Sequence, residues 1–273
     1  MKIKIVKCLT DNYYYIIFDE RTLSAAVIEP SEADPIINQI EQNKLVLKYI
    51  FNTHHHYDHV GGNQKLKEKY SCKVVGFEKD KHRIPDIDIG LKDNEKWKNE
   101  LFECEIKHIP GHTSGHICIY IKKLNALFTG DTLFSLGCGR IFEGTYEEMY
   151  QSLNKLKKFP NDTKIYCGHE YTKKNSDFCL SIDKNNSSLI EKIKKINKNI
   201  NNGMPTIPSV LADELSCNIF LRSNNLDIQK QLGINSSDPI ETFAKLRDLK
   251  DNFWFIKLDY IGSRSLLLKK FNS

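Results

Sequence analysis

Four histidines and one aspartate crowd into the six residues 54–59, which read His-His-His-Tyr-Asp-His. They follow an apolar run at residues 44–51 that the pattern predicts to be a buried strand. Alternate residues of an extended chain point the same way, so His54 and His56 can reach one ion. Imidazoles packed together without a metal would repel one another when protonated and would leave ring nitrogens unpaired. The tract therefore favours a fold that ends a strand at a metal site over a surface tract without a role.

Three further polar segments each follow an expected strand and carry a glycine beside the polar residue. The ends of strands and the loops after them are where open α/β sheets place their sites. The expected metal ligands are His54, His56, Asp58, His59, His112, Asp131 and His169. Seven donors exceed the three or four that one zinc ion takes, so they suit two divalent ions that share a bridging carboxylate. Imidazole and carboxylate without thiolate suit zinc, with iron or manganese as alternatives.

The pattern of apolar residues predicts two regions of different character. Expected strands cover residues 3–9, 13–19, 25–29, 44–51, 73–77, 103–109, 117–121, 127–130 and 164–167. Expected helices cover residues 32–43, 63–70 and 146–159, and residues 79–95 are polar and turn-rich. After residue 172 the period becomes helical, with one helix capped by Asn186 or Ser187 and another over residues 238–250. We expect an α/β domain at residues 1–172 and a mainly helical domain at residues 173–273.

The charge and the cysteines exclude several classes of protein. The net charge of +5 comes mostly from lysines spread along the chain, which lacks the sharp basic footprint of a nucleic-acid-binding surface. No apolar stretch approaches the ~20 residues of a membrane helix. The 8 cysteines form no C-x-x-C pair, and residues 1–7 insert lysines between apolar residues, unlike a signal peptide. We expect free thiols, a cytoplasmic location, no nucleic-acid or membrane partner, and a monomer, with self-association as the alternative.

The motif His-x-His-x-Asp-His at residues 54–59, with His112, Asp131 and His169 after it, resembles the binuclear site of the metallo-β-lactamase superfamily. Within that superfamily the segment Gly-Cys-Gly-Arg at residues 137–140 and the helical tail resemble the glyoxalase II (hydroxyacylglutathione hydrolase) family. The resemblance covers nearly the whole chain. It implies a four-layer αββα sandwich followed by a helical domain.

The resemblance also implies an activity and roles for the ligands. It assigns His54, His56 and His112 to one metal and Asp58, His59 and His169 to the other, with Asp131 as the bridge. Asp58 and Asp131 are the carboxylates expected to take part in catalysis. The implied reaction is hydrolysis of S-D-lactoylglutathione, and of other 2-hydroxyacyl-glutathione thioesters, by a hydroxide that bridges the metals. The products are glutathione and D-lactate, in the second step of methylglyoxal detoxification.

The expected substrate contacts are Arg140, Phe142, Tyr171, Arg247 and Lys250. Arg140 stands where the family usually has a lysine, and Phe142 stands where it usually has a tyrosine, which removes one hydrogen bond to the substrate. Arg247 and Lys250 lie three positions apart on one expected helical face. Without the resemblance, an ordinary solvated helix face would be the better interpretation of that pair. Residues 253–273 run beyond the family's usual end, where an extra packed strand or a self-association edge would fit.

Three alternatives remain beside this interpretation. The first is another hydrolase or oxygenase of the same superfamily. A persulfide dioxygenase holds one iron and needs fewer of these ligands, so the full set of seven argues against it. A metal-dependent nuclease would need a basic surface rather than a short Arg/Lys pair near the C-terminus. A structural zinc protein would have a closed, thiolate-rich site, whereas this set leaves open positions.

Overall fold

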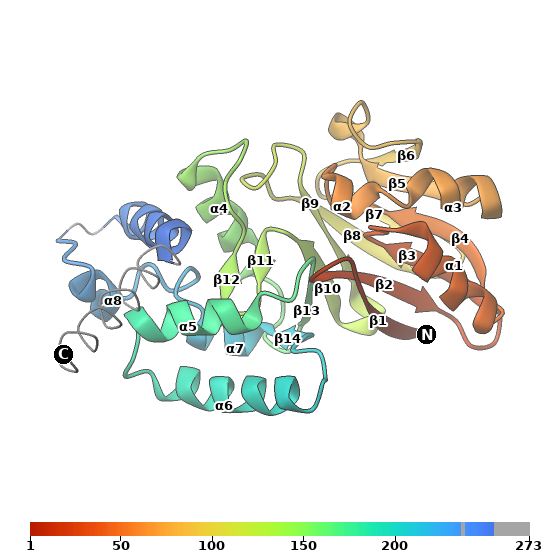
Figure 1. Cartoon of the computed structure of the whole chain (residues 1–273). Helices are drawn as coiled ribbons and strands as arrows, with labels where there is room; N and C mark the ends of the chain where they lie inside the picture. Colours follow the sequence, from red (N-terminus) through yellow and green to blue (C-terminus); the bar gives the residue numbers. More distant parts are fainter. Residues whose placement is uncertain (236–237, 254–273) are drawn as a thin grey trace, which may run out of the picture.

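The computed structural model describes residues 1–235 and 238–253, in which two mixed sheets face each other (Figure 1). The first sheet has the strand order β1 (Lys2–Cys8), β2 (Asn12–Phe18), β3 (Ser24–Ile28), β4 (Val46–Phe51), β5 (Lys73–Phe77) and β6 (Ile87–Leu91). The second has the order β14 (Ser209–Val210), β13 (Lys164–Cys167), β10 (Ala126–Gly130), β9 (Ile117–Ile121), β8 (Glu103–His108) and β7 (Lys96–Lys98). A small hairpin of β11 (Leu133–Phe134) and β12 (Gly137–Cys138) follows β10.

Helices cover the outer face of each sheet (Figure 1). The helices before the second sheet are α1 (Ala33–Gln42), α2 (Tyr57–Val60) and α3 (Asn63–Tyr70). Those after β12 are α4 (Tyr146–Leu156), α5 (Thr172–Ile182), α6 (Ser187–Asn201), α7 (Leu211–Cys217), α8 (Leu226–Gln231) and a last described helix over residues 239–253. None of the described helices combines the length and the apolar composition that a bilayer crossing requires.

Strand β2 shows why the sheets are sandwiched. Tyr13 and Tyr15 point into the cluster between the two sheets, whereas Tyr14 and Ile16 point into the cluster beneath α1 and α3. Successive strand residues face opposite sides, so a strand that is apolar at every position must be covered on both faces. The second sheet is likewise covered by α4 to α7 on its outer face. The predicted four-layer αββα sandwich is confirmed.

The chain after residue 172 packs on the second sheet and also extends it. Leu127 of β10 and Ile165 of β13 share one buried cluster with Phe178, Leu189 and Phe243 of the helical region. Strand β14, beyond residue 172, pairs antiparallel with β13. The division into domains at residue 172 stays a prediction.

Local signals placed several elements correctly. The hairpin around residues 10–12 forms, with Cys8 opposite Asn12. Asn186 caps α6 by accepting the Leu189 N–H at 3.1 Å. Asp238 accepts the Ile240 N–H at 2.9 Å at the start of the last described helix, as its spacing predicted.

The polar stretch at residues 79–95 holds an element that the pattern did not predict. Strand β6 pairs with β5 at the edge of the first sheet, and only Leu91 of its five residues is buried. An edge strand with little burial carries a weak apolar alternation, so its pattern resembles a loop. The strand or association edge suggested for the tail falls on residues 254–273, outside the described residues.

Candidate active site

The expected ligands leave neighbouring strands at one end of the sandwich. Strands β10 and β13 run parallel with Gly130 beside Cys167, so Asp131 and His169 emerge at the same edge. The histidine tract follows β4 in the first sheet, and its Thr53 carbonyl accepts the Ile117 N–H of β9 at 2.9 Å. That hydrogen bond joins the two sheets where both open toward the site. Tertiary structure therefore gathers segments that are far apart in the chain.

One group of donors consists of His54, His56 and His112, whose ligand atoms lie within 4.8 Å of one another. The other nitrogen of two of these rings is held by the protein. His54 Nδ1 lies 3.0 Å from Thr53 Oγ1, and His112 Nδ1 lies 2.8 Å from the Arg140 carbonyl oxygen. Because a backbone carbonyl only accepts, His112 carries its proton on Nδ1, and its Nε2 lone pair faces the site.

The second group consists of Asp58, His59 and His169, again with ligand atoms within 4.8 Å of one another. His169 Nδ1 faces Asp11 Oδ1 at 3.0 Å, and His59 Nδ1 faces the buried carboxylate of Glu29 at 2.5 Å. The Asn12 amide donates to Asp58 Oδ2 at 2.9 Å. Carboxylates behind ligand histidines fix the ring orientation and the tautomer.

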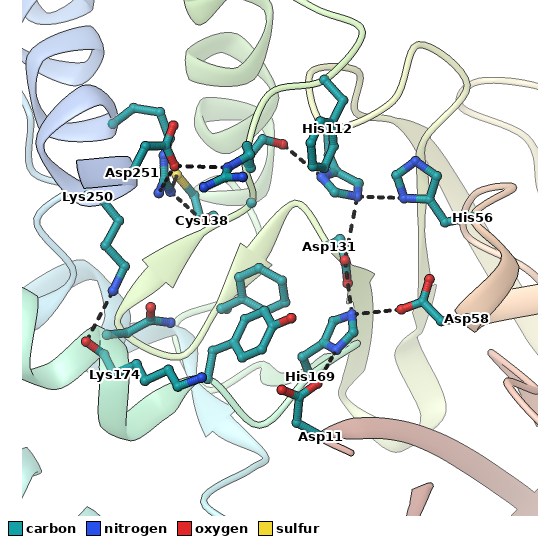
Figure 2. A pocket seen from close by; sticks show the side chains of 17 residues that line it. Asp11, His56, Asp58, His112, Asp131, Cys138, His169, Lys174, Lys250 and Asp251 are labelled. Atoms are coloured by element: carbon teal, nitrogen blue, oxygen red, sulfur yellow. Dashed lines mark hydrogen bonds and ion pairs between the residues drawn. The ribbon is translucent and has the colours of Figure 1, made fainter. Parts of the chain in front are cut away.

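Asp131 lies between the two groups, as Figure 2 shows for its neighbours His112 and His169. Its Oδ1 is 3.6 Å from His59 Nε2. Its Oδ2 is 3.5 Å from His112 Nε2 and 3.2 Å from His169 Nε2. One carboxylate therefore faces both groups, the arrangement that a bridging ligand requires.

The donor set fits divalent metal ions by its unsatisfied atoms. His54 Nε2, His59 Nε2 and Asp131 Oδ1 are buried and have no hydrogen-bond partner in the described part of the chain. A buried polar atom without a partner costs free energy that native proteins rarely leave uncompensated. Cations held by the two donor groups would satisfy all three atoms.

The electrostatics prepare His54, His56 and Asp131 as ligands. Burial lowers the pKa of His56 to about 4 and the pKa of His54 well below its usual range, so both rings are neutral with free lone pairs. Burial opposes ionisation of Asp131, but the neighbouring His169 and His59 hold the pKa of that carboxyl well below its usual range. The carboxylate is therefore anionic at neutral pH.

Glu29 and Asp11 are site residues that the sequence reasoning did not predict. Glu29 accepts hydrogen bonds from Thr53 N and Thr53 Oγ1 at 2.7 and 2.8 Å besides facing His59. The signal was present, because Glu29 is a charged residue at the end of an expected strand, directly before Pro30. The pattern of a strand does not distinguish its last residue from a residue of the site that follows it.

The two remaining histidines of these segments lie behind the site. His116 Nε2 accepts the Asp131 N–H at 3.1 Å, and its ring stacks on His54 with centroids 4.6 Å apart. His55 turns the other way, toward Asp80 at 3.3 Å and Glu143 at 3.5 Å. Neither ring belongs to the two donor groups.

A cavity of about 480 Å³ opens beside the donor cluster (Figure 2). Its walls include all five expected substrate contacts and one lysine that was not expected: Arg140, Phe142, Tyr171, Lys174, Arg247 and Lys250. Lys174 follows Tyr171 by three positions on α5, so it enters the cavity from the same side. The Tyr171 ring stacks on His169, with centroids 4.7 Å apart.

Phe142 stands at the mouth of the cavity. Its side chain is 60% exposed, and its ring centroid lies 5.3 Å from that of His112 and 5.9 Å from that of His56. A phenyl ring supplies an apolar wall there without a hydroxyl to donate.

The basic residues of the cavity differ in their exposure to solvent and in their hydrogen-bond partners. Arg247 is only 5% exposed and donates to the Cys138 carbonyl and to Asp251 Oδ1, both at 2.8 Å. Arg140 is more exposed, and its Nε lies 3.2 Å from the same Asp251 oxygen. Lys250 donates to the Lys174 carbonyl at 3.1 Å, and burial lowers its pKa to about 8.

Two consecutive parts of the chain match models of known protein families. Residues 22–169 match the metallo-β-lactamase superfamily, and residues 170–253 match the family described as the C-terminus of hydroxyacylglutathione hydrolase.

Curated relatives match over almost their whole length. A hydroxyacylglutathione hydrolase of Pelagibacter ubique is 55% identical over 93% of this chain and 100% of its own. One of Methylococcus capsulatus is 40% identical over 93% of this chain and 99% of its own.

Solved structures share the fold. ETHE1 from Myxococcus xanthus gives a TM-score of 0.66 at 21% identity, covering 93% of this chain and 91% of its own. The BLEG-1 B3 metallo-β-lactamase gives 0.64 at 20% identity, covering 81% of this chain and 99% of its own.

Proposed function

This chain belongs to the hydroxyacylglutathione hydrolase family of the metallo-β-lactamase superfamily, and on that premise we propose that it hydrolyses S-D-lactoylglutathione to glutathione and D-lactate. Other 2-hydroxyacyl-glutathione thioesters would be substrates as well, and the reaction would be the second step of methylglyoxal detoxification. The observation that carries the proposal is one cavity that joins the histidine and aspartate cluster to four basic side chains.

Two divalent ions, zinc or alternatively iron or manganese, would be held by the seven donors. His54, His56 and His112 would hold one, Asp58, His59 and His169 the other, and Asp131 both. Such ions supply Lewis acidity that polarises the thioester carbonyl and makes water nucleophilic at neutral pH. Glu29 and Asp11 would keep the protons of His59 and His169 on Nδ1, so that each Nε2 lone pair stays available.

The leaving group explains why the site needs no strong acid. A glutathione thiolate has a conjugate acid with a pKa of about 8.5, so it departs without receiving a proton. The remaining task of the chain is to bind and orient the tripeptide, whose two carboxylates are anionic at neutral pH. Arg140, Lys174 and Lys250 would attract those carboxylates, with Arg247 behind them.

The cellular setting forms part of the proposal. All eight cysteines lie in the described ranges as buried, free thiols, which suits the reducing cytoplasm where glutathione is abundant. We propose that the enzyme acts there as a monomer, without nucleic acid or a membrane as partner.

The direct test measures cleavage of S-D-lactoylglutathione by the purified chain together with the number of metal ions per chain. Two ions per chain and thioester cleavage would support the proposal. One iron per chain with oxygen uptake, and no thioester cleavage, would refute it in favour of a persulfide dioxygenase.

The substitution Arg247→Ala should raise KM more than it lowers kcat. Arg247 holds Asp251 and the Cys138 carbonyl, which line the cavity away from the metal donors. Loss of binding shared by the ground state and the transition state appears in KM. Steady-state kinetics with S-D-lactoylglutathione checks this, and an unchanged KM would remove Arg247 from the substrate site.

The ratio kcat/KM should fall as the pH rises through about 8 because Lys250, whose pKa burial lowers to about 8, loses its charge there. The ammonium that attracts the substrate carboxylate is present below that pH and absent above it. Since kcat/KM reports ionisations of the free enzyme, its pH profile is the measurement. The variant Lys250→Arg keeps its charge and should lack this fall, so identical profiles would contradict the assignment.

A further inference from the structure

The β11–β12 hairpin leaves the second sheet directly after Asp131 and comes back beside that residue at Gly139. At its base the Gly139 N–H donates to the Thr132 carbonyl at 3.2 Å. A Cβ on Gly139 would lie 1.8 Å from the Asp131 carbonyl oxygen, so the two segments touch. The carbonyl oxygen of the next residue, Arg140, accepts a hydrogen bond from His112 Nδ1. The base of the hairpin therefore supports two of the proposed metal ligands, Asp131 by contact and His112 by a hydrogen bond.

The tip of the hairpin lies in the helical region. Figure 1 shows β11 and β12 on the side of β10 where the helical region lies, above α5 and α7 in this view. Leu136, at the tip, is fully buried and has a φ of 59°. A leucine in this left-handed conformation is strained, and it persists only where the surrounding structure holds it.

Two side chains of α7 and its C-cap hold the tip. Glu214 Oε2 accepts the Leu136 N–H at 2.7 Å and an Asn218 amide hydrogen at 3.1 Å. The same Asn218 amide donates to the Gly137 carbonyl at 3.1 Å. Both side chains are fully buried, so these hydrogen bonds are shielded from competition with water.

Other side chains of the helical region bind the remaining carbonyls of the turn. Asn175 Nδ2 donates to the Ser135 carbonyl at 3.1 Å, and Cys179 Sγ lies 3.1 Å from the Leu136 carbonyl. Glu214 differs from them because it is the acceptor for the backbone N–H of the strained residue.

Lys192 of α6 makes this arrangement possible. Its Nζ lies 2.6 Å from Glu214 Oε1, and Lys192 itself is only 8% exposed. A buried carboxylate without a cation would be strongly unfavourable. This lysine therefore has a partner inside the protein.

We propose that Glu214 is a positioning residue of the metal site: it fixes Leu136 and the hairpin, whose base sets Asp131 and His112. The inference rests on the proposed function in taking those two residues as ligands. The hairpin thus connects the donors Asp131 and His112, at the edge of the second sheet, with Glu214 in the helical region.

Two double variants separate the hydrogen bond from the buried charge. The pair Lys192→Met with Glu214→Gln removes both charges and keeps an oxygen that can accept the Leu136 N–H. The pair Lys192→Met with Glu214→Leu removes both charges and the acceptor. Zinc affinity, measured on the full chain by competition with a chromophoric chelator, should stay close to wild type in the first variant. In the second it should fall by about tenfold, the lower end of the range for outer-shell partners of metal ligands.

Thermal melting gives the unfolding temperature of each variant. The zinc affinities are compared at a temperature at which both variants are folded. Equal zinc affinities in the two folded variants would overturn the proposal, whatever their stabilities. If the Glu214→Leu variant does not fold, Glu214→Asp keeps the charge beside Lys192 and shortens the reach to Leu136. Wild-type zinc affinity in Glu214→Asp would then overturn the proposal. Zinc binding does not require turnover, so failure of the thioesterase assay in the wild type would be a separate result.

Discussion

The substitution Asp131→Ala should abolish thioester hydrolysis and strip the protein of metal. Asp131 faces His59, His112 and His169 with its two oxygens, all within 3.6 Å. Glu29 also lies near one histidine of each group, but it faces the Nδ1 atoms of His54 and His59, whereas Asp131 faces Nε2 atoms. Outer-shell partners change metal affinity by about 10–100-fold, so loss of a ligand shared by two ions should exceed that range.

The measurement pairs metal content after dialysis with the rate of hydrolysis of S-D-lactoylglutathione. Asp34→Ala serves as the control. This aspartate of α1 forms an exposed ion pair with Lys65 of α3, in the helix layer on the outer face of the first sheet. The control should keep wild-type metal content and turnover. Full metal content with wild-type turnover in Asp131→Ala would refute the ligand assignment.

The substitution Glu29→Gln should weaken metal binding by about 10–100-fold although the residue is not one of the seven expected donors. Glu29 accepts hydrogen bonds from Thr53 and faces His59 Nδ1 with the same carboxylate. In the variant, an amide oxygen that faces Thr53 N places the NH₂ group against His59 Nδ1. That nitrogen must then accept, so the proton of His59 moves to Nε2, the nitrogen that faces Asp131.

Metal affinity by chelator competition measures this effect, and turnover at saturating metal provides a second reading. A shifted affinity with recovered turnover at high metal is the expected pattern. Glu41→Gln, at an exposed ion pair with Lys69, is the matched control and should behave as wild type. Unchanged metal affinity in Glu29→Gln would show that its carboxylate does not set the His59 tautomer.

Local patterns predicted several of the elements that bury one face or both, although helices α5 and α7 were not among the expected helices. Strand β2 is recognisable as a continuous apolar run and helix α4 by its helical period, and Asn186 and Asp238 mark helix starts by capping. The edge strand β6 escaped prediction because a strand that buries little apolar surface leaves little pattern. The two-residue strand β14 is too short for any period to appear.

The basic residues show where a pattern stops being informative. The spacing of Arg247 and Lys250 indicates one helical face, and both line the cavity. The spacing does not reveal that Arg247 is buried and bound to Asp251, whereas Lys250 is desolvated enough to change its pKa. Burial depends on what packs against the helix, and that neighbour is the β11–β12 hairpin, about a hundred residues earlier in the chain.

By itself, the sequence determined the donor types, their order and their places at strand ends, because the period of a strand and the chemistry of imidazole and carboxylate are local properties. Only the tertiary structure decided which residues stand behind the donors. Asp11 meets His169 across 158 positions and Glu29 meets His59 across 30, and no local period connects such pairs. Packing of the two sheets brings these pairs together, and each buried polar group needs a hydrogen-bond partner there. Both conditions arise only in the folded chain.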